Sequence, residues 1–162
     1  MRKARGLAAG LGAGALATYV LGIVYDAIYR RESPSVHRRE AQLEDHSAPQ
    51  VLGEKLLRAV GRQPSEAEIK TAGKAVHWIF GVTNGLIFSL VVHRCKGQSV
   101  VLGLPFGLAL YAVHLFGVPA LNLSPPSRAF PSQTRVRGLA YHAAYGAVLG
   151  LVYAILAPSD SM

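Results

Sequence analysis

Side chains that can bind metals, move protons or exchange hydrogen bonds lie inside long apolar stretches of this chain. They are His77, Asn84, Tyr111, His114, His142 and Tyr145. Neutral imidazole is a common metal and haem ligand, and histidine is also the side chain that titrates near neutral pH. Polar groups at membrane depth cost free energy unless they are paired, so they are candidates for a functional site. Three interpretations stay open: a metal or haem site, a path for protons or small solutes, and hydrogen bonding between helices.

Motifs typical of common enzymes do not occur in the sequence. No two of the three histidines share a predicted helix, so there is no ligand pair at i, i+4. The chain lacks the HExxH, CxxC, GxSxG and Walker A patterns. Its single cysteine excludes an internal disulfide. These observations favour a role without catalysis, and they leave haem or a metal as the only cofactors that the histidines suggest.

The elements that position these residues follow from where the charges lie. Charged residues make up 16% of the 162 residues, against roughly 25% in an average soluble protein, and 51% are hydrophobic. Four stretches contain no formal charge except Asp26. They are residues 6–28, 75–92, 99–121 and 139–157. A helix needs about 20 apolar residues to cross a bilayer, so the sequence predicts an all-α, polytopic membrane protein with four transmembrane helices in one membrane domain.

The first stretch and the loop charges bear on processing and orientation. Arg2, Lys3 and Arg5 before an apolar run resemble a signal peptide, but the run is longer than the about 7–15 residues of a signal core.

The charges of the connections bear on the orientation in the membrane. Five of the 17 Lys and Arg residues fall on the side of the termini and twelve on the other. The positive-inside rule then places the two long connections in the cytoplasm, whereas the basic start of the first span favours the opposite orientation.

Small residues recur every four positions in the predicted spans. These rows contain Gly10, Gly14 and Gly22 in the first span, Gly81 and Gly85 in the second, and Gly146 and Gly150 in the fourth. Residues four apart share one helix face, and small side chains there let helix backbones approach closely in lipid. We therefore expect the rows to face one another in a compact bundle or to face a second copy. His77 and His142 lie on these rows and His114 on the face of Gly107, so all three are predicted to point inward.

The long extramembrane segment, residues 30–71, carries charges of both signs. We expect residues 32–47 to be a solvated loop. Apolar residues at helical spacing predict a short amphipathic helix at about 50–61, which lies either on the membrane surface or on the end of the bundle. Ser65 with Glu68 three residues later is a capping box, so a helix is predicted to begin at Glu66 and to continue into the second span. The proline-rich connection 122–137 is expected to be irregular.

The second half of the chain resembles the YagU-like family of uncharacterised bacterial inner-membrane proteins. The resemblance covers roughly residues 75–157. It rests on Gly81-Val-Thr-Asn84 before an apolar run, on Val113-His114 followed by Pro119 and Leu123-Ser-Pro-Pro126, and on His142 in the last span. The family has histidine where this chain has Asn84, and its second-span histidine is out of register with His77, which leaves His114 and His142 as the better pair. The resemblance implies a multi-pass protein of the bacterial plasma (inner) membrane and brings no activity with it.

These observations together favour a small integral membrane protein that acts as a non-enzymatic scaffold, accessory or stress-related factor. The alternatives are a redox protein that holds haem or a metal through the histidines, and a conduit for protons or small solutes. The expected partners are the lipid bilayer and either a second copy or another membrane protein. Nucleic acid is not expected, because no folded soluble basic domain remains to bind it.

Overall fold

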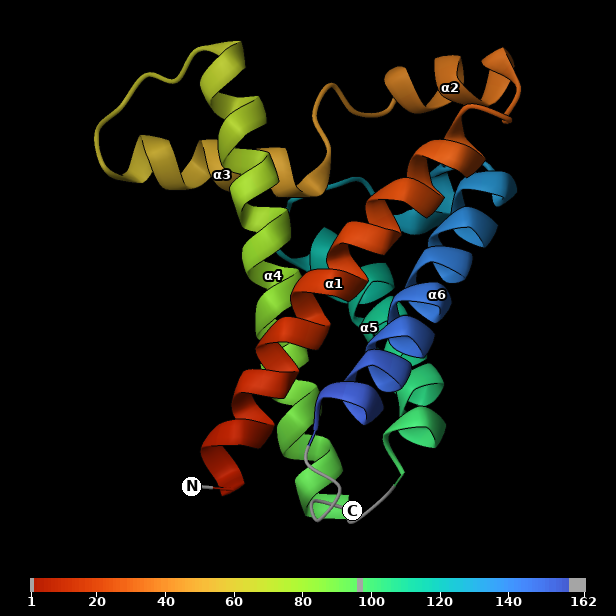
Figure 1. The fold of residues 1–162 in the computed structure, drawn as a ribbon. Helices are drawn as coiled ribbons and strands as arrows, with labels where there is room; N and C mark the ends of the chain where they lie inside the picture. Colours follow the sequence, from red (N-terminus) through yellow and green to blue (C-terminus); the bar gives the residue numbers. More distant parts are fainter. Residues whose placement is uncertain (1, 96–97, 158–162) are drawn as a thin grey trace. The chain divides into compact units, whose positions relative to one another are not determined.

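The computed structural model describes residues 2–95 and 98–157, and this part of the chain is all-helical without strands (Figure 1). This confirms the predicted fold class. The helices are α1 (Arg2–Tyr29), α2 (Pro34–Ala41), α3 (Ala48–Ala59), α4 (Glu66–Cys95), α5 (Ser99–Ala120), the 3-10 turn η1 (Ser127–Ala129) and α6 (Ser132–Leu156).

Four of these helices, α1, α4, α5 and α6, are long and apolar enough to cross a membrane, so the chain is a multi-pass membrane protein. Helices α4 and α6 begin well before the apolar stretches from which they were predicted. Helix α4 begins nine residues before its apolar stretch, and its 30 residues are about 45 Å long. Its first turn is fixed by the predicted capping box, in which the backbone N–H of Ser65 donates to the Glu68 carboxylate at 2.8 Å.

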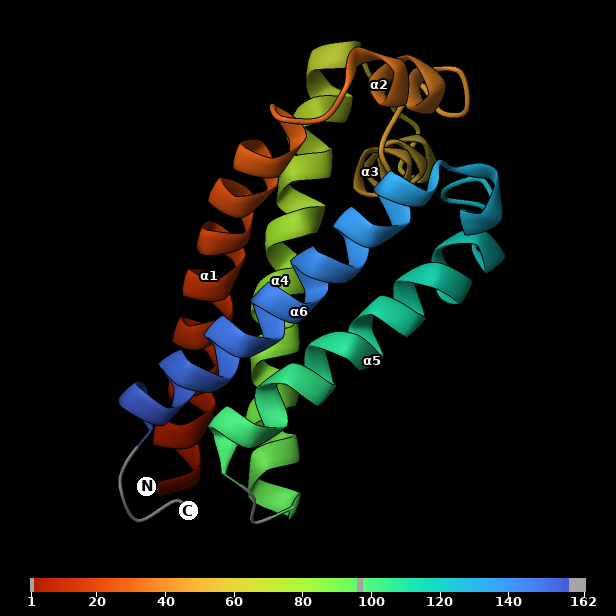
Figure 2. The ribbon, with the colours of Figure 1, turned by 90° about the vertical axis from the view of Figure 1, so that its right-hand side faces the viewer.

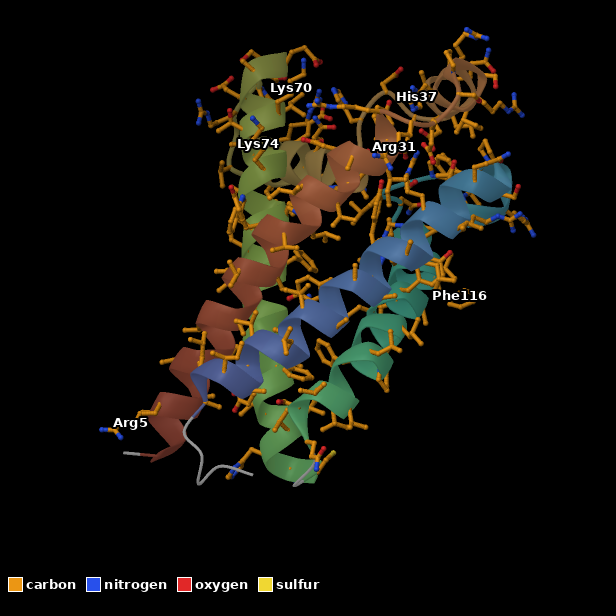
Figure 3. The ribbon with its side chains drawn as sticks, turned by 45° about the vertical axis from the view of Figure 1, so that its right-hand side comes forward. Arg5, Arg31, His37, Lys70, Lys74 and Phe116 are labelled. Atoms are coloured by element: carbon orange, nitrogen blue, oxygen red, sulfur yellow. The ribbon has the colours of Figure 1, made fainter. Side chains whose placement is uncertain are left out.

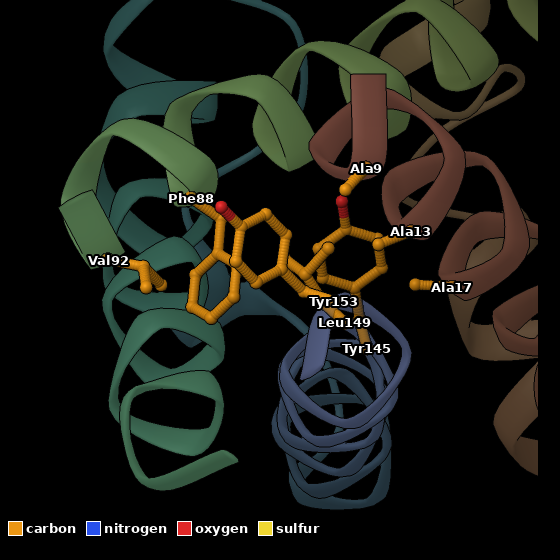
Figure 4. Close-up of a cluster of buried hydrophobic side chains, with 8 residues drawn as sticks. All are labelled: Ala9, Ala13, Ala17, Phe88, Val92, Tyr145, Leu149 and Tyr153. Carbon is orange, nitrogen blue, oxygen red and sulfur yellow. The ribbon is translucent and has the colours of Figure 1, made fainter. Parts of the chain in front are cut away.

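The described chain divides into two compact units, of which the first comprises residues 2–31, 80–95, 98–111 and 137–157. Its core joins small residues of α1 to large side chains of α4 and α6 (Figure 4). These residues are Ala9, Ala13, Ala17, Phe88, Val92, Tyr145, Leu149 and Tyr153. The Phe88 ring is fully buried and meets the Tyr153 ring edge-on at 5.7 Å. Within this unit α5 lies beside α6 (Figure 2).

The second unit comprises residues 32–79 and 112–136. In it α3 lies across the first turns of α4, from which Lys70 and Lys74 project, and Phe116 projects outward from α5 (Figure 3). Two residues after the end of α3, Gly61 has a φ of +81°, and the N–H of Arg62 bonds back to the carbonyl oxygen of Leu57 at 3.1 Å. Two residues after the end of α5, Asn122 is also left-handed at +52°, and the N–H of Leu123 bonds back to the carbonyl oxygen of Val118 at 3.1 Å. Both ends are Schellman-type stops.

Two expectations about the connections are wrong. The segment 32–47 is not a loop throughout, because it contains α2, which begins with Ser33 as N-cap and Pro34 in its first turn. This combination is a common helix start, since the fixed φ of proline suits the first turn and its missing N–H is not needed there. The segment 122–137 is irregular only as far as Pro131, because α6 begins at Ser132. The amphipathic helix predicted at about 50–61 is α3, shifted by two residues.

Candidate functional site

Two of the polar residues predicted to be functional meet inside the first unit. His142 on α6 lies with its ring centroid 5.5 Å from that of Tyr111 on α5. Its Nδ1 is 2.8 Å from the carbonyl oxygen of Gly138, one turn earlier. A carbonyl only accepts, so Nδ1 carries the proton and the lone pair of the neutral ring is on Nε2. The ring is half-buried, in agreement with an inward-facing position.

The other two histidines belong to the second unit, and neither is buried. We expected both to point inward, yet His77 on α4 and His114 on α5 have exposed side chains. The prediction is wrong for His77 because a row repeating every four residues drifts around a helix of 3.6 residues per turn. Gly73 at the start of the same row is buried. Among residues 2–95 and 98–157 no group of three or more His, Cys, Asp or Glu side chains is arranged to hold a metal ion.

Two further polar residues predicted to be functional, Tyr145 and Asn84, bond to helix backbone. The Tyr145 hydroxyl on α6 donates to the carbonyl oxygen of Gly81 on α4 at 2.6 Å. The Asn84 amide donates to the carbonyl oxygen of Phe80 at 2.9 Å, within α4 itself. These bonds satisfy polar groups where water is absent, which is the usual requirement inside a bilayer.

The glycine rows form two close helix crossings within the first unit. At the crossing of α1 and α4, a Cβ added to Gly10 would lie 2.6 Å from the carbonyl oxygen of Gly85, and one added to Gly14 would lie 2.8 Å from that of Gly81. Only glycine permits this approach of two backbones. Gly22, predicted to be part of the same row, is different, since nothing lies within 4 Å of its added Cβ.

The second crossing joins α5 and α6 in the same manner. A Cβ on Gly150 would lie 2.6 Å from the carbonyl oxygen of Ser99, and one on Gly146 would meet the backbone of Gly103 and Gly107. The rows therefore face one another inside the chain, which was one of the two arrangements expected. Tyr145, on the same helix as Gly146, links this pair of helices to α4 through its bond to Gly81.

An aromatic cluster surrounds a buried arginine in the first unit, and it was not predicted from the sequence. Arg137 on α6 is only 8% exposed, and its guanidinium carbon lies 5.3 Å from the ring centroid of Tyr29 and 5.9 Å from that of Tyr25. Tyr141 packs on Tyr25 with ring centroids 5.0 Å apart. Such cation–π contacts are favourable, especially where water is excluded. The sequence signal was the pair of tyrosines four residues apart at the end of the first span, since they share one helix face.

A second group that was missed lies outside the spans, in the second unit. Glu44, after α2, accepts a hydrogen bond from the Ser124 hydroxyl at 2.8 Å. Partial burial raises the pKa of Glu44 above its ordinary value, an effect that the bond from Ser124 opposes and the nearby Glu40 strengthens. Glu40 accepts from the Thr134 hydroxyl in the first turn of α6 at 2.5 Å. A carboxylate there also interacts favourably with the positive end of the helix dipole.

On α3, Lys55 donates from Nζ to the carbonyl oxygens of Leu121 and Asn122, at 3.2 and 2.9 Å. These carbonyls lie at the end of α5, where a helix leaves acceptors without partners and favours positive charge. His46 of the same segment makes a further polar contact, with its Nε2 3.2 Å from a carboxylate oxygen of Glu66, the first residue of α4. The extramembrane segment thus contacts the ends of both α4 and α5.

Comparison with models of protein families, with curated proteins and with solved structures finds no match for this chain.

Proposed function

We propose that this chain is a small protein of the bacterial inner membrane, related to the YagU-like family, that acts as a non-enzymatic scaffold or accessory factor. The four apolar helices support the membrane location. The proposed relationship rests on the residues that carry the resemblance, which lie in α4, α5, α6 and the α5–α6 connection.

The observation that carries the scaffold proposal is the use of polar side chains at the helix crossings. Tyr145 of α6 donates to the backbone of Gly81 of α4 where α1 and α4 cross, and a hydrogen bond of this kind joins helices in lipid. Within α1, the Thr18 hydroxyl at the same crossing donates to the carbonyl oxygen of Gly14 at 2.7 Å, which satisfies the hydroxyl there. Polar groups within the spans therefore hold the bundle together, as expected for a chain whose task is to present its outer surface to a partner.

Photo-crosslinking in the membrane tests this proposal. Benzoylphenylalanine replaces Leu104, an exposed residue of α5, the span with the smallest buried share. The matched control carries it in place of Phe88, which is fully buried in the same unit. We expect a discrete adduct with a second polypeptide, either another copy or another membrane protein, from position 104 only. Adducts with lipid alone at position 104, repeated at the exposed positions of the other spans, would refute the scaffold role.

A second candidate, a haem or metal protein, is favoured by one observation at His142. Its proton on Nδ1 is held by the carbonyl oxygen of Gly138, which leaves Nε2 with the lone pair. Metal-ligating histidines commonly have their second ring nitrogen fixed in this way. An absorption spectrum and elemental analysis of the purified protein distinguish the two candidates. A Soret band or a stoichiometric metal that disappears in His142→Ala would establish the second, and a colourless, metal-free protein favours the scaffold.

A further inference from the structure

Helix α3 lies at the level where the apolar part of α4 begins. A Cβ added to Gly53 of α3 would be 2.8 Å from the Cβ of Ala72 and 3.0 Å from the backbone nitrogen of Gly73. The uncharged stretch of α4 starts at Ala75. At a rise of about 1.5 Å per residue, the crossing is within about 5 Å of that start along the helix axis.

The contact of α3 with the end of α5 independently places α3 at the boundary of the apolar layer. Lys55 of α3 bonds to the carbonyl oxygens of Leu121 and Asn122. The apolar stretch that forms the third span ends at Leu121, directly before the polar Asn122. Two spans, through different contacts, therefore place α3 at the boundary between the apolar layer and the polar layer.

One of the faces of α3 that its neighbours leave uncovered is apolar. Leu56 is 55% exposed and Val60, directly after the helix, is 74% exposed. At 100° per residue, Leu52, Leu56 and Val60 fall within about 80° of one another. Arg58 lies about 160° from Leu56 on the helix wheel and forms an ion pair with Glu54 at 2.7 Å. The helix thus has an apolar stripe, Leu52–Leu56–Val60, opposite a charged face.

We propose that α3 is an interfacial helix whose apolar stripe inserts among the lipid acyl chains just below the headgroups. This inference rests on the membrane location proposed above. A helix with one apolar and one charged face, held at the boundary of the hydrocarbon layer, has the properties of an in-plane anchor. Three side chains fall well short of the about 800 Å² per partner that a stable protein interface buries. The bilayer is therefore the occupant, and α3 fixes how deeply α4 and α5 sit.

Depth-dependent fluorescence quenching tests the proposal on the full chain. Trp78 is the only tryptophan, so Trp78→Phe gives a background into which single tryptophans are placed. Leu56→Trp reports on the stripe, Arg58→Trp on the charged face, and Leu104→Trp on an exposed position within the span α5. The variants are reconstituted in phosphatidylcholine vesicles, with acyl chains brominated or not, and circular dichroism checks that their helix content is equal.

We expect brominated lipid to quench Leu56→Trp at least about twofold more strongly than Arg58→Trp, and aqueous iodide to show the opposite order. Equal iodide quenching at both positions would overturn the proposal, because the stripe would then face water. Protection of Leu56→Trp from both quenchers, lost on dilution into excess lipid, would overturn it in favour of a second copy. Leu104→Trp separates the two proposals, since absence of lipid quenching there contradicts the membrane location itself.

Discussion

Replacement of Gly14 by alanine tests whether the crossing of α1 and α4 stabilises the bundle. The new Cβ would lie 2.8 Å from the carbonyl oxygen of Gly81 and 2.9 Å from the Cα of Gly85. Both are backbone atoms, so no side-chain rotation relieves the contact. The two helices must move apart by roughly 0.5 Å to restore ordinary van der Waals distances, and a gap of this size forfeits about a quarter of the dispersion energy of each contact.

The loss of unfolding free energy in Gly14→Ala can be estimated from that displacement and measured against a matched control variant. Overpacking of a close contact typically costs about 1–3 kcal/mol. Gly22→Ala is the same substitution in the same helix, but nothing lies within 4 Å of its new Cβ. Both variants gain the helix propensity of alanine, about 1 kcal/mol, so this contribution cancels in their difference. We expect Gly14→Ala to be less stable than Gly22→Ala by about 1–3 kcal/mol.

Reversible unfolding in mixed micelles with increasing dodecyl sulfate, followed by far-ultraviolet circular dichroism, measures this difference. Equal free energies of unfolding for the two variants would show that the crossing contributes nothing, and would refute the reasoning from backbone contact. A Gly14→Ala variant more stable than Gly22→Ala would show that the helices are farther apart than the structure has them.

Three further predictions use the same unfolding assay or hydrogen exchange. Tyr145→Phe removes the hydroxyl that donates to Gly81 and should lower the free energy of unfolding by about 0.5–1.5 kcal/mol; an unchanged value would mean that the bond is not formed. Lys55→Met removes the ammonium that bonds to the end of α5, and amide exchange should become faster there and stay unchanged in α1. Burial raises the pKa of Glu44 above 4.5, against the opposing bond from Ser124, so the folded chain binds this proton more tightly than the unfolded chain. The free energy of unfolding should therefore fall as pH rises through the range just above 4.5, and Glu44→Gln should flatten that slope; an identical slope in both proteins would contradict this assignment.

The features that could be predicted from the sequence are those with strong local signals. The absence of charge over about 20 residues gave the four spans, and the Ser65–Glu68 pair gave the start of α4. The glycine rows indicated close packing because glycine at every fourth position has a direct geometric meaning. Spacing alone does not decide which row meets which, and only the structure pairs α1 with α4 and α5 with α6.

The features that were missed depend on contacts between distant segments. Arg137 was counted as a loop charge, because nothing near it in the sequence shows that Tyr25 and Tyr29 surround it. The inward orientation expected for His77 failed because a row of small residues predicts a face only over the few turns that touch a neighbour. Helix α2 was missed because its eight residues show only one buried apolar side chain, Val36, too few for a periodic pattern.

The contact between α6 and α1 sets an order of events during synthesis of the chain. The Tyr141 hydroxyl on the last span donates to the carbonyl oxygen of Tyr25 on the first, 116 residues earlier. At roughly 5–20 residues per second, a ribosome needs about 6–23 s to make the intervening chain. During that interval the end of α1 that carries Tyr25 is in the bilayer before α6 has been made. A ribosome that stalls before the last span therefore leaves the Tyr25 carbonyl oxygen without the Tyr141 hydroxyl that bonds to it in the finished protein.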